Sequence, residues 1–250
     1  TYHDTKGPLI IKMLNRANAI TVVSNNLKNE LINHKIDADK ITVIPNGVDI
    51  DSFKLQDKYI CRQRLNIHSS DPMVLYVGRL SIEKNIKSLI IAAEKIIANR
   101  NNFNLYIVGD GPLEAELKTL SKQLKIENYV HFVGKVDHSE IRTWMSSTDF
   151  FSLPSIGEGC PNDILEALGC GRPVISSNVG AIPDVVNEQS GILFDPNSIE
   201  DIVSSFTQAF NRSWDEKKIT DSIKDLTWEN AAKNYLAVFE STQKPENSFD

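Results

Sequence analysis

Two glutamates, Glu158 and Glu166, stand eight positions apart around a glycine turn, a proline and the predicted start of a helix. One carboxylate would lie in the loop above the helix start, and the other would project from the helix body. Backbone N–H groups at the start of a helix point outward and can bind an anion. The spacing therefore predicts a site for a ligand with hydroxyl groups at both ends and phosphate in the middle, as in a nucleotide-sugar.

Two cations are expected beside these acids. Gly78 allows a tight exit from an apolar strand over 73–77, so Arg79 and Lys84 would overhang the carboxyl edge of a sheet. Lys84, in the first helical turn after Ser81 as the expected cap, opposes the helix dipole, and an anionic ligand would relieve this conflict. Two solvated surface cations are the plainer interpretation of such a pair. The stretch 158–166 is expected at the same sheet edge, and its helix start can bind an anion. This neighbour favours anion binding by the two cations instead.

Alternating strands and helices would position these residues. Short apolar, β-branched runs predict the strands, and amphipathic stretches predict the helices. Strands that are apolar on both faces predict an α/β fold, a parallel sheet with helices on both faces. No element is assigned to residues 1–16, and a short helix is expected within 51–70. The predicted strands span 19–23, 41–44, 73–77, 103–108, 130–133, 150–153, 173–176 and 191–194, and the predicted helices about 25–34, 83–99, 112–125, 138–147, the stretch that carries Glu166, 181–187, 199–210, 215–224 and 228–242.

The composition narrows the function classes. The chain has 250 residues, 41% of them apolar, enough for one large domain or for one domain and part of another. Its net charge of −6 argues against nucleic-acid binding, which needs a basic face. Neither the three cysteines nor the histidines show metal-ligand spacing, so reduced thiols, no metal site and a cytoplasmic location are expected. No signal peptide or membrane-spanning run is recognised, and contact with the inner face of a membrane stays open.

Two further strand ends could contact a nucleotide. Gly109 opens a turn over 109–112, which is most simply explained as turn chemistry. Val133 is the last residue of the predicted strand over 130–133, where its backbone could contact the base of a nucleotide. Neither segment, nor any other, gives G-x-G-x-x-G or G-x-x-x-x-G-K-[ST]. The absence of these glycine-rich motifs weakens the alternative that the predicted sheet belongs to an NAD-linked oxidoreductase.

Four segments together resemble the signature of the group 1 retaining glycosyltransferases, which have the two-domain GT-B fold. They are 45–49 (PNGVD), 77–84 (VGRLSIEK), 108–112 (VGDGP) and 155–174 (SIGEGCPNDILEALGCGRPV). The match runs from about residue 17 to residue 240. The resemblance implies a Rossmann-like donor-binding domain, the C-terminal half of the GT-B fold, over 49–226. It also implies a remnant of the N-terminal acceptor domain over 1–48 and a crossing helix and tail over 227–250.

The resemblance implies roles for single residues. Glu166 would bind the ribose hydroxyls of the donor, Glu158 would contact the donor sugar, and Arg79 and Lys84 would bind the diphosphate as it leaves. His3 is similar to an acceptor-domain histidine that faces the donor sugar. Asp163 departs from the family pattern at a helix start that should meet phosphate, so it is expected to turn away or to act as a cap. The remaining residues expected to line the nucleotide site are Gly78, Gly109, Val133, Cys160, Pro161, Asn162 and Ile164.

The leading hypothesis is transfer of a sugar, with retained configuration and without a metal ion or cofactor, from a nucleotide-diphosphate donor. The acceptor would be a glycan, a lipid-linked molecule or a small polyol. An alternative is a nucleotide-sugar binding module that is inactive alone, because the family's complete N-terminal domain is expected before residue 1. That domain would supply most acceptor contacts and any peripheral contact with a membrane.

Overall fold

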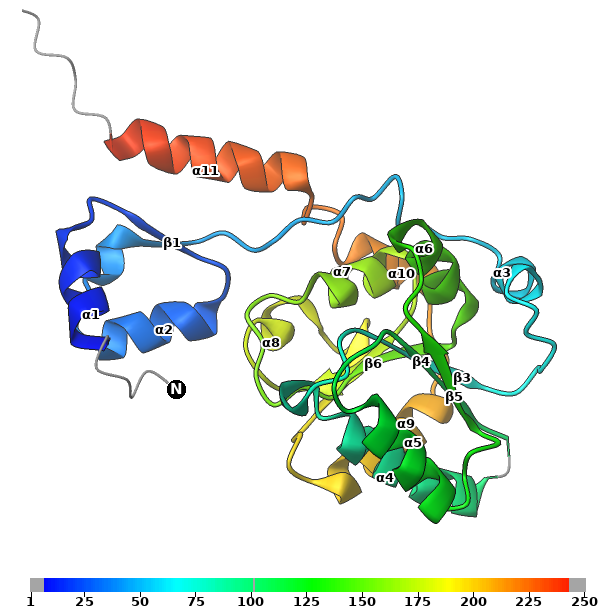
Figure 1. Ribbon diagram of the computed structural model, residues 1–250. Coiled ribbons are helices and arrows are strands. Elements are labelled where there is room, and N and C mark those ends of the chain that lie inside the picture. The colour runs from blue at the N-terminus through cyan, green and yellow to red at the C-terminus, as the bar shows by residue number, and fades with distance from the viewer. Residues whose placement is uncertain (1–6, 101, 243–250) are drawn as a thin grey trace, which may run out of the picture.

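The computed structural model describes residues 7–100 and 102–242. The chain forms a larger unit around a six-stranded sheet and a smaller unit around a two-stranded sheet, with the last helix reaching from the larger unit toward the smaller one (Figure 1).

The large sheet is parallel throughout, as the apolar strands predict. Its strands are β3 (Met73–Val77), β4 (Asn104–Val108), β5 (Val130–Gly134), β6 (Phe150–Leu153), β7 (Val174–Ser177) and β8 (Gly191–Phe194). They lie in the order β5-β4-β3-β6-β7-β8, and each neighbouring pair is parallel. The chain therefore reverses its direction of travel across the sheet between β3 and β6. In doubly wound sheets, a crevice opens for ligands at the carboxyl ends of the strands at such a point.

Helices cover both faces of this sheet (Figure 1). On one face lie α4 (Ile86–Asn99), α5 (Glu114–Gln123) and α9 (Ile199–Phe210). On the other lie α3 (Lys58–Arg64), α6 (His138–Ser147), α7 (Asn162–Gly169) and α10 (Glu216–Asp221). The short α8 (Ile182–Val185) stands at the side that faces the smaller unit. Since both faces are covered, β3, β6 and β7 are buried at every position, which explains their unbroken apolar or small side chains.

The smaller unit contains α1 (Gly7–Arg16), β1 (Ile20–Val22), α2 (Asn25–Asn33), a 3-10 turn over Ala38–Lys40 and β2 (Ile41–Val43). The two strands are parallel and in register from Ile20 opposite Ile41. No helix or strand was predicted for the stretch that forms α1. Its Gly7–Pro8 pair resembles a turn, but proline is also tolerated in the first turn of a helix, where its missing N–H costs nothing.

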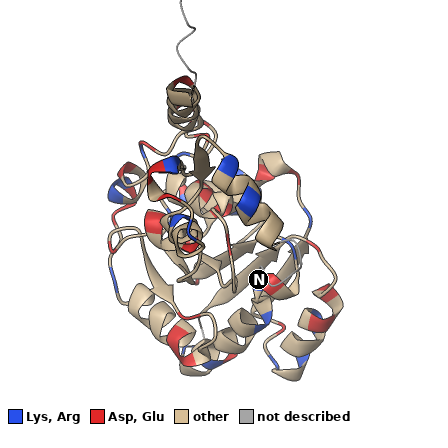
Figure 2. Ribbon diagram, turned by 90° about the vertical axis from the view of Figure 1, so that its left-hand side faces the viewer, with Lys and Arg blue, Asp and Glu red and all other residues tan. Residues whose placement is uncertain are grey.

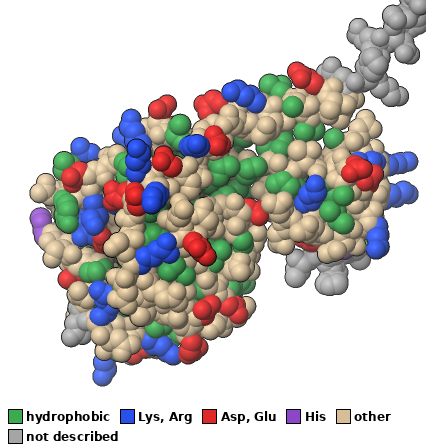
Figure 3. All heavy atoms as spheres, turned by 180° about the vertical axis from the view of Figure 1, so that it is seen from behind, with side chains coloured by type: hydrophobic (Ala, Val, Ile, Leu, Met, Phe, Trp, Pro, Cys, Tyr) green, Lys and Arg blue, Asp and Glu red, His purple; other side chains and the backbone are tan. Residues whose placement is uncertain are grey.

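Two chain crossings join the units side by side. The first is the segment 44–57, and the second enters α11 (Trp228–Thr242). Val48 N–H donates to the Leu226 carbonyl at 2.9 Å, and Val48 pairs with Thr227 in a parallel bridge. Seen from behind, hydrophobic side chains gather beneath α11 between the two bodies (Figure 3). Within the described residues, none of the helices has both the length and the apolar character needed to cross a membrane.

Candidate functional site

The loops after β3, β4 and β5 meet at the carboxyl edge of the sheet, beside its reversal point. Gly78 N–H donates to the Val108 carbonyl at 3.0 Å, and Gly109 N–H donates to the Gly134 carbonyl at 2.8 Å. Val133 lies one residue earlier in β5 and is half-buried. The structure thus brings Gly78, Gly109 and Val133 to one edge, as the sequence predicts.

Lys84 and Glu158 form an ion pair at this edge. Lys84 Nζ lies 2.6 Å from Glu158 Oε1, and the two side chains are 21% and 11% exposed. Ser155 Oγ donates to the same carboxylate oxygen at 2.6 Å. From the sequence, a ligand was expected to offset the unfavourable place of Lys84 near a helix start, but the protein supplies an anion of its own, Glu158. The second oxygen, Glu158 Oε2, has no hydrogen-bond partner among the described residues.

Lys84 reaches this position from a 3-10 turn, Ile82–Lys84, and not from the first turn of α4 as predicted. The helix begins only at Ile86, because Asn85 adopts a left-handed conformation with φ +53°. Ser81 does not cap by its side chain, and its hydroxyl donates instead to Glu83 Oε1 at 2.6 Å.

Arg79 stands in the open part of the site. Its side chain is exposed and forms no ion pair with any residue of the described chain. Its carbonyl accepts a hydrogen bond from the Tyr76 hydroxyl at 2.9 Å. Burial, and then the charges of Asp163 and Glu158, raise the pKa of Tyr76, so this hydroxyl stays protonated and keeps donating. Tyr76 therefore fixes the backbone of the loop and leaves the guanidinium free to meet a ligand.

Asp163 does not cap α7, which was one of the two placements predicted for it. The N-cap of α7 is Pro161, and no side chain of the described residues caps the helix. The charges of Lys84 and Glu158 both act on the Asp163 carboxyl. Burial raises the pKa of Asp163 to about 6 against the lowering effect of Lys84, and Glu158 adds to the rise. With this pKa, about a tenth of the Asp163 carboxyl groups carry a proton at pH 7, so the carboxylate predominates and its conflict with a phosphate remains.

Glu166 projects from the next turn of α7. Burial, and then the charge of Asp163, raise the pKa of Glu166 to about 7. The carboxyl has no hydrogen-bond partner in the part of the chain that the structure describes. It borders a cavity of about 540 Å³ between the first crossing segment, α6 and α7, which is lined by Gly47, Val48, Asp49, Ser52, Phe53, His138, Ser139, Arg142, Asn162, Glu166 and Trp228.

The loop that carries Glu158 rests on the turn after β7. Gly180 has φ +59°, and a Cβ atom there would lie 1.9 Å from the Glu158 carbonyl oxygen. Ala181 N–H also donates to the Gly159 carbonyl at 2.9 Å. This close approach requires glycine at position 180. Glu158 and Gly180 border a second cavity, of about 580 Å³, whose opposite wall is the first part of α2 in the smaller unit.

The other predicted site residues differ in how exposed they are and in which of their atoms lie near the site. Cys160 is a half-buried free thiol, and Asn162 is exposed at the start of α7. The Ile164 side chain is fully buried in the core, and its N–H donates to the Pro161 carbonyl at 3.3 Å, so only its backbone lies near the site. His3 lies outside the described residues.

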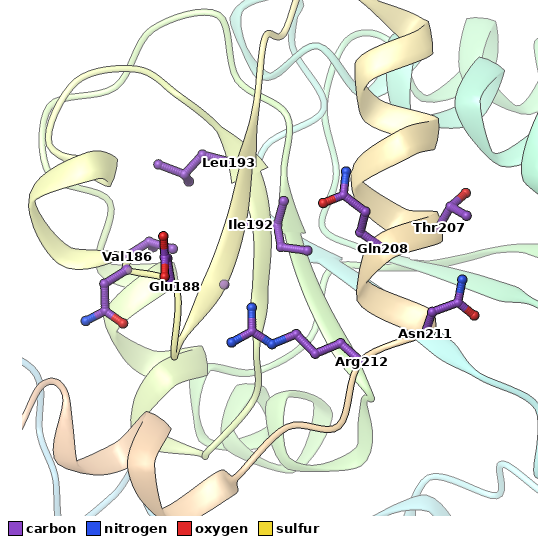
Figure 4. A pocket seen from close by; sticks show the side chains of 10 residues that line it. Val186, Glu188, Ile192, Leu193, Thr207, Gln208, Asn211 and Arg212 are labelled. Atoms are coloured by element: carbon purple, nitrogen blue, oxygen red, sulfur yellow. The ribbon is translucent and has the colours of Figure 1, made fainter.

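Charge and cavity size alone do not single out this site. Lys and Arg are interspersed with Asp and Glu over the helices that face the viewer in Figure 2. A cavity of about 810 Å³ lies elsewhere, between β8 and the end of α9 (Figure 4). It includes none of the predicted site residues and is lined by Val186, Asn187, Glu188, Gly191, Ile192, Leu193, Thr207, Gln208, Asn211 and Arg212.

Sequence reasoning missed two supporting side chains. Tyr76 was assigned only to a strand, although a tyrosine in an otherwise aliphatic buried strand needs a partner for its hydroxyl. Ser155 stands three positions before Glu158, close enough for its hydroxyl to contact the carboxylate. Among the described residues, no three His, Cys, Asp or Glu side chains are grouped as metal ligands.

Comparisons with known proteins agree with this architecture. A family model described as "Glycosyl transferases group 1" matches residues 57–226, and one described as "Glycosyltransferase Family 4" matches residues 1–52. The chain is 29% identical over 232 residues to an uncharacterized glycosyltransferase of Methanocaldococcus jannaschii, covering 88% of this chain and 59% of that protein. It is 24% identical over 249 residues to the GPI3 subunit of a Saccharomyces cerevisiae phosphatidylinositol N-acetylglucosaminyltransferase, covering 97% and 55%. The chain thus spans little more than half the length of these relatives.

Solved structures show the same fold. Anabaena Alr3699/HepE in complex with UDP superposes with a TM-score of 0.84 at 22% identity, covering 96% of this chain and 69% of that one. The lipopolysaccharide outer core galactosyltransferase WaaB superposes with a TM-score of 0.80 at 24% identity, covering 96% and 66%. The group 1 model matches well over half of the sequence and contains the whole six-stranded sheet with its cluster of site residues. The chain therefore belongs to the family of glycosyl transferases group 1.

Proposed function

We propose that the larger unit binds a nucleoside diphosphate sugar and serves the transfer of its sugar to a hydroxyl-bearing acceptor. The observation that carries this proposal is the grouping of Lys84, Glu158 and the start of α7, which no side chain of the described chain caps, at the reversal point of the sheet. Arg79 stands at the same edge with an uncommitted guanidinium. Fixed cations and outward N–H groups are the partners that a diphosphate requires.

In this proposal each part of the donor has its own partner. The diphosphate lies over the start of α7 between Arg79 and Lys84. These groups stabilise the negative charge that the diphosphate gains as the bond to the sugar breaks. Glu158 Oε2 accepts a hydrogen bond from a hydroxyl of the sugar, while Oε1 accepts one from Lys84 and holds it in place. Glu166 accepts hydrogen bonds from the ribose hydroxyls. These hydroxyls provide the hydrogen-bond partners that its half-buried carboxyl does not find among the described residues.

Retention of configuration, independence of metal ions and the acceptor classes are further parts of the proposal. Arg79 and Lys84 supply positive charge where many transferases use a metal ion. A glycan, a lipid-linked molecule or a small polyol remains the proposed acceptor. The names of two relatives, the phosphatidylinositol-directed yeast subunit and an alpha-monoglucosyldiacylglycerol synthase of Streptococcus pneumoniae, favour lipid acceptors. Lipid acceptors would agree with a cytoplasmic protein that works at the inner face of a membrane.

Calorimetric titration with UDP, GDP, ADP and NAD tests the donor site. We expect one diphosphate to bind more tightly than NAD, and UDP is the first choice because the Anabaena neighbour was solved with UDP. NAD binding in preference to all three diphosphates would reject the proposal and favour an oxidoreductase.

A second candidate is a binding module that does not catalyse transfer by itself. The observation that favours it is that the chain spans 55–59% of the curated relatives described above, so contacts to an acceptor can lie outside it. Hydrolysis or transfer of the donor sugar by the 250-residue chain, followed by NMR of the anomeric proton of the product, distinguishes the two. Turnover by this chain would reject the module, and a retained anomer would support the proposed stereochemistry.

A further inference from the structure

Asn46 connects the first chain crossing with the donor site. Its side-chain Nδ2 donates to the Cys160 carbonyl at 3.0 Å and to Asn162 Oδ1 at 2.8 Å. In the sequence, position 46 was noted only within 45–49, one of the four segments that carry the family resemblance. We propose that Asn46 is a positioning residue that keeps the start of α7 in the shape that receives a diphosphate. This inference rests on the proposed function, because it concerns the same donor site.

The backbone of Asn46 is itself held firmly from the other side. A Cβ atom on the next residue, Gly47, would lie 2.2 Å from the backbone nitrogen of Trp228, so the two chains touch directly. The following N–H, from Val48, donates to the Leu226 carbonyl at 2.9 Å. The amide of Asn46 therefore reaches α7 from a fixed base, and little conformational freedom is lost when it binds there.

The two acceptors of this amide decide what it holds. Cys160 and Asn162 flank Pro161, the N-cap of α7, so Asn46 grips the turn on both sides of the helix start. Asparagine side chains commonly bind backbone N–H groups at helix starts. Because Asn162 Oδ1 already accepts from Asn46, it is drawn away from the first N–H groups of α7. Those groups then stay available to an anionic ligand.

A second polar link between the two units offers a control. Asn25 also links the two units, through its N–H to Asp184 Oδ2 at 2.8 Å and its Nδ2 to Asp184 Oδ1 at 3.2 Å. This link ends at α8 and touches neither Cys160 nor Asn162. Asn25→Ala would keep the backbone N–H, so the control is Asp184→Ala, which removes both hydrogen bonds. If Asn46 served only to hold the units together, Asp184→Ala and Asn46→Ala would act alike.

The test compares a ligand that has the diphosphate with one that lacks it. Affinities for UDP and for uridine are measured by calorimetry on the 250-residue chain, or for GDP and guanosine if the parent prefers GDP. We expect Asn46→Ala to weaken UDP binding by about five- to tenfold, as the loss of one or two hydrogen bonds would. Uridine affinity should change by less than about twofold, and Asp184→Ala should change neither affinity by more than that.

Each alternative result has a defined meaning. UDP affinity of Asn46→Ala equal to that of the parent overturns the positioning role. Equal weakening of UDP and uridine, or equal losses in Asn46→Ala and Asp184→Ala, also overturns it, because the effect would then not be specific to the phosphate. Should Asn46→Ala not fold, Asn46→Ser gives the same comparison with a residue suited to turns. A parent chain that binds no diphosphate would instead reject the proposed function itself.

Discussion

The carboxyl group of Glu166 titrates near neutral pH, since burial and the charge of Asp163 raise its pKa to about 7 from 4.5. The folded chain then holds this proton more tightly than the unfolded chain does. Glu166 therefore lowers the free energy of unfolding progressively as the pH rises from about 4.5 to about 7. Asp163, with its pKa raised to about 6, acts in the same direction over a lower range.

We expect Glu166→Gln to be more stable than the parent by about 1–2 kcal/mol at pH 8 and nearly equal to it at pH 4. The amide that replaces the carboxyl group cannot ionise, so the cost of a half-buried charge disappears. Urea denaturation at the two pH values measures this difference. A stability gap that is the same at both pH values would contradict the raised pKa. Loss of nucleotide affinity in the same variant would support the ribose-binding role.

Lys84 offers a second test at the scale of one residue. Without it, the mostly buried Glu158 loses its cation and the proposed diphosphate loses a partner. We expect Lys84→Ala to weaken UDP binding by about tenfold or more and to lower the free energy of unfolding by about 1–3 kcal/mol. Lys87→Ala is the control. The Lys87 side chain is 59% exposed, and its Nζ lies 3.6 Å from Oε1 of the equally exposed Glu116, so this surface pair contributes little. Equal effects of both substitutions on UDP binding would remove the role of Lys84.

The sequence located the charged residues of this site but not their partners. Residue type and position relative to the strands predict which edge Arg79, Lys84 and Glu158 occupy. The Lys84–Glu158 pair joins loops 74 positions apart, and its formation depends on how two neighbouring strands set those loops side by side. For the same reason, the helix-start pattern did not show that Asp163 leaves α7 uncapped or that its carboxyl group is buried by the surrounding residues.

Among the structural elements, the turn at Gly180 has the sharpest geometric demand. A methyl group there would overlap the Glu158 carbonyl, and φ +59° disfavours any side chain. We expect Gly180→Ala to lower the free energy of unfolding by about 1–3 kcal/mol and to weaken donor binding by displacing the Glu158 loop. Gly157→Ala is a matched control in that loop, since a Cβ atom there meets nothing within 4 Å. Thermal unfolding with and without UDP compares the two, and equal losses would contradict the steric argument.

Strands were predicted more accurately than helix starts. The six strands of the large sheet agree with their predicted ranges to within one residue at each end, because short β-branched runs have few other interpretations. The helix predicted from 83 begins at Ile86 because Asn85 leaves the helical conformation. The Asn85 side chain donates to the carbonyls of Pro154 and Pro196, which lie far along the chain. Local patterns carry no information about such contacts.

For the whole molecule, we expect only the first part of α11 to contribute to the stability of the described chain. Ala231 is its one buried residue, whereas Leu236 is 59% and Phe239 62% exposed. We expect a chain that ends at Lys233 to unfold within about 3 °C of the parent. A chain that ends at Leu226 should unfold at a clearly lower temperature, since it loses Ala231 and the Val48–Thr227 bridge. Circular dichroism melts measure both, and equal losses would show that the outer part of α11 is packed.

The chain passes between the two units at Val48 and again near Leu226. This double connection affects how a ligand contacts the two walls of the cavity beside Glu158, which are the Glu158 loop and the first part of α2. Because the chain passes between the units twice at one place, opening of the polar contacts elsewhere need not let the units diffuse apart. Such a short double tether gives each wall a high effective concentration at the other. A molecule bound to the Glu158 wall would then reach the α2 wall by an intramolecular step, so weak contacts on α2 can suffice for tight overall binding.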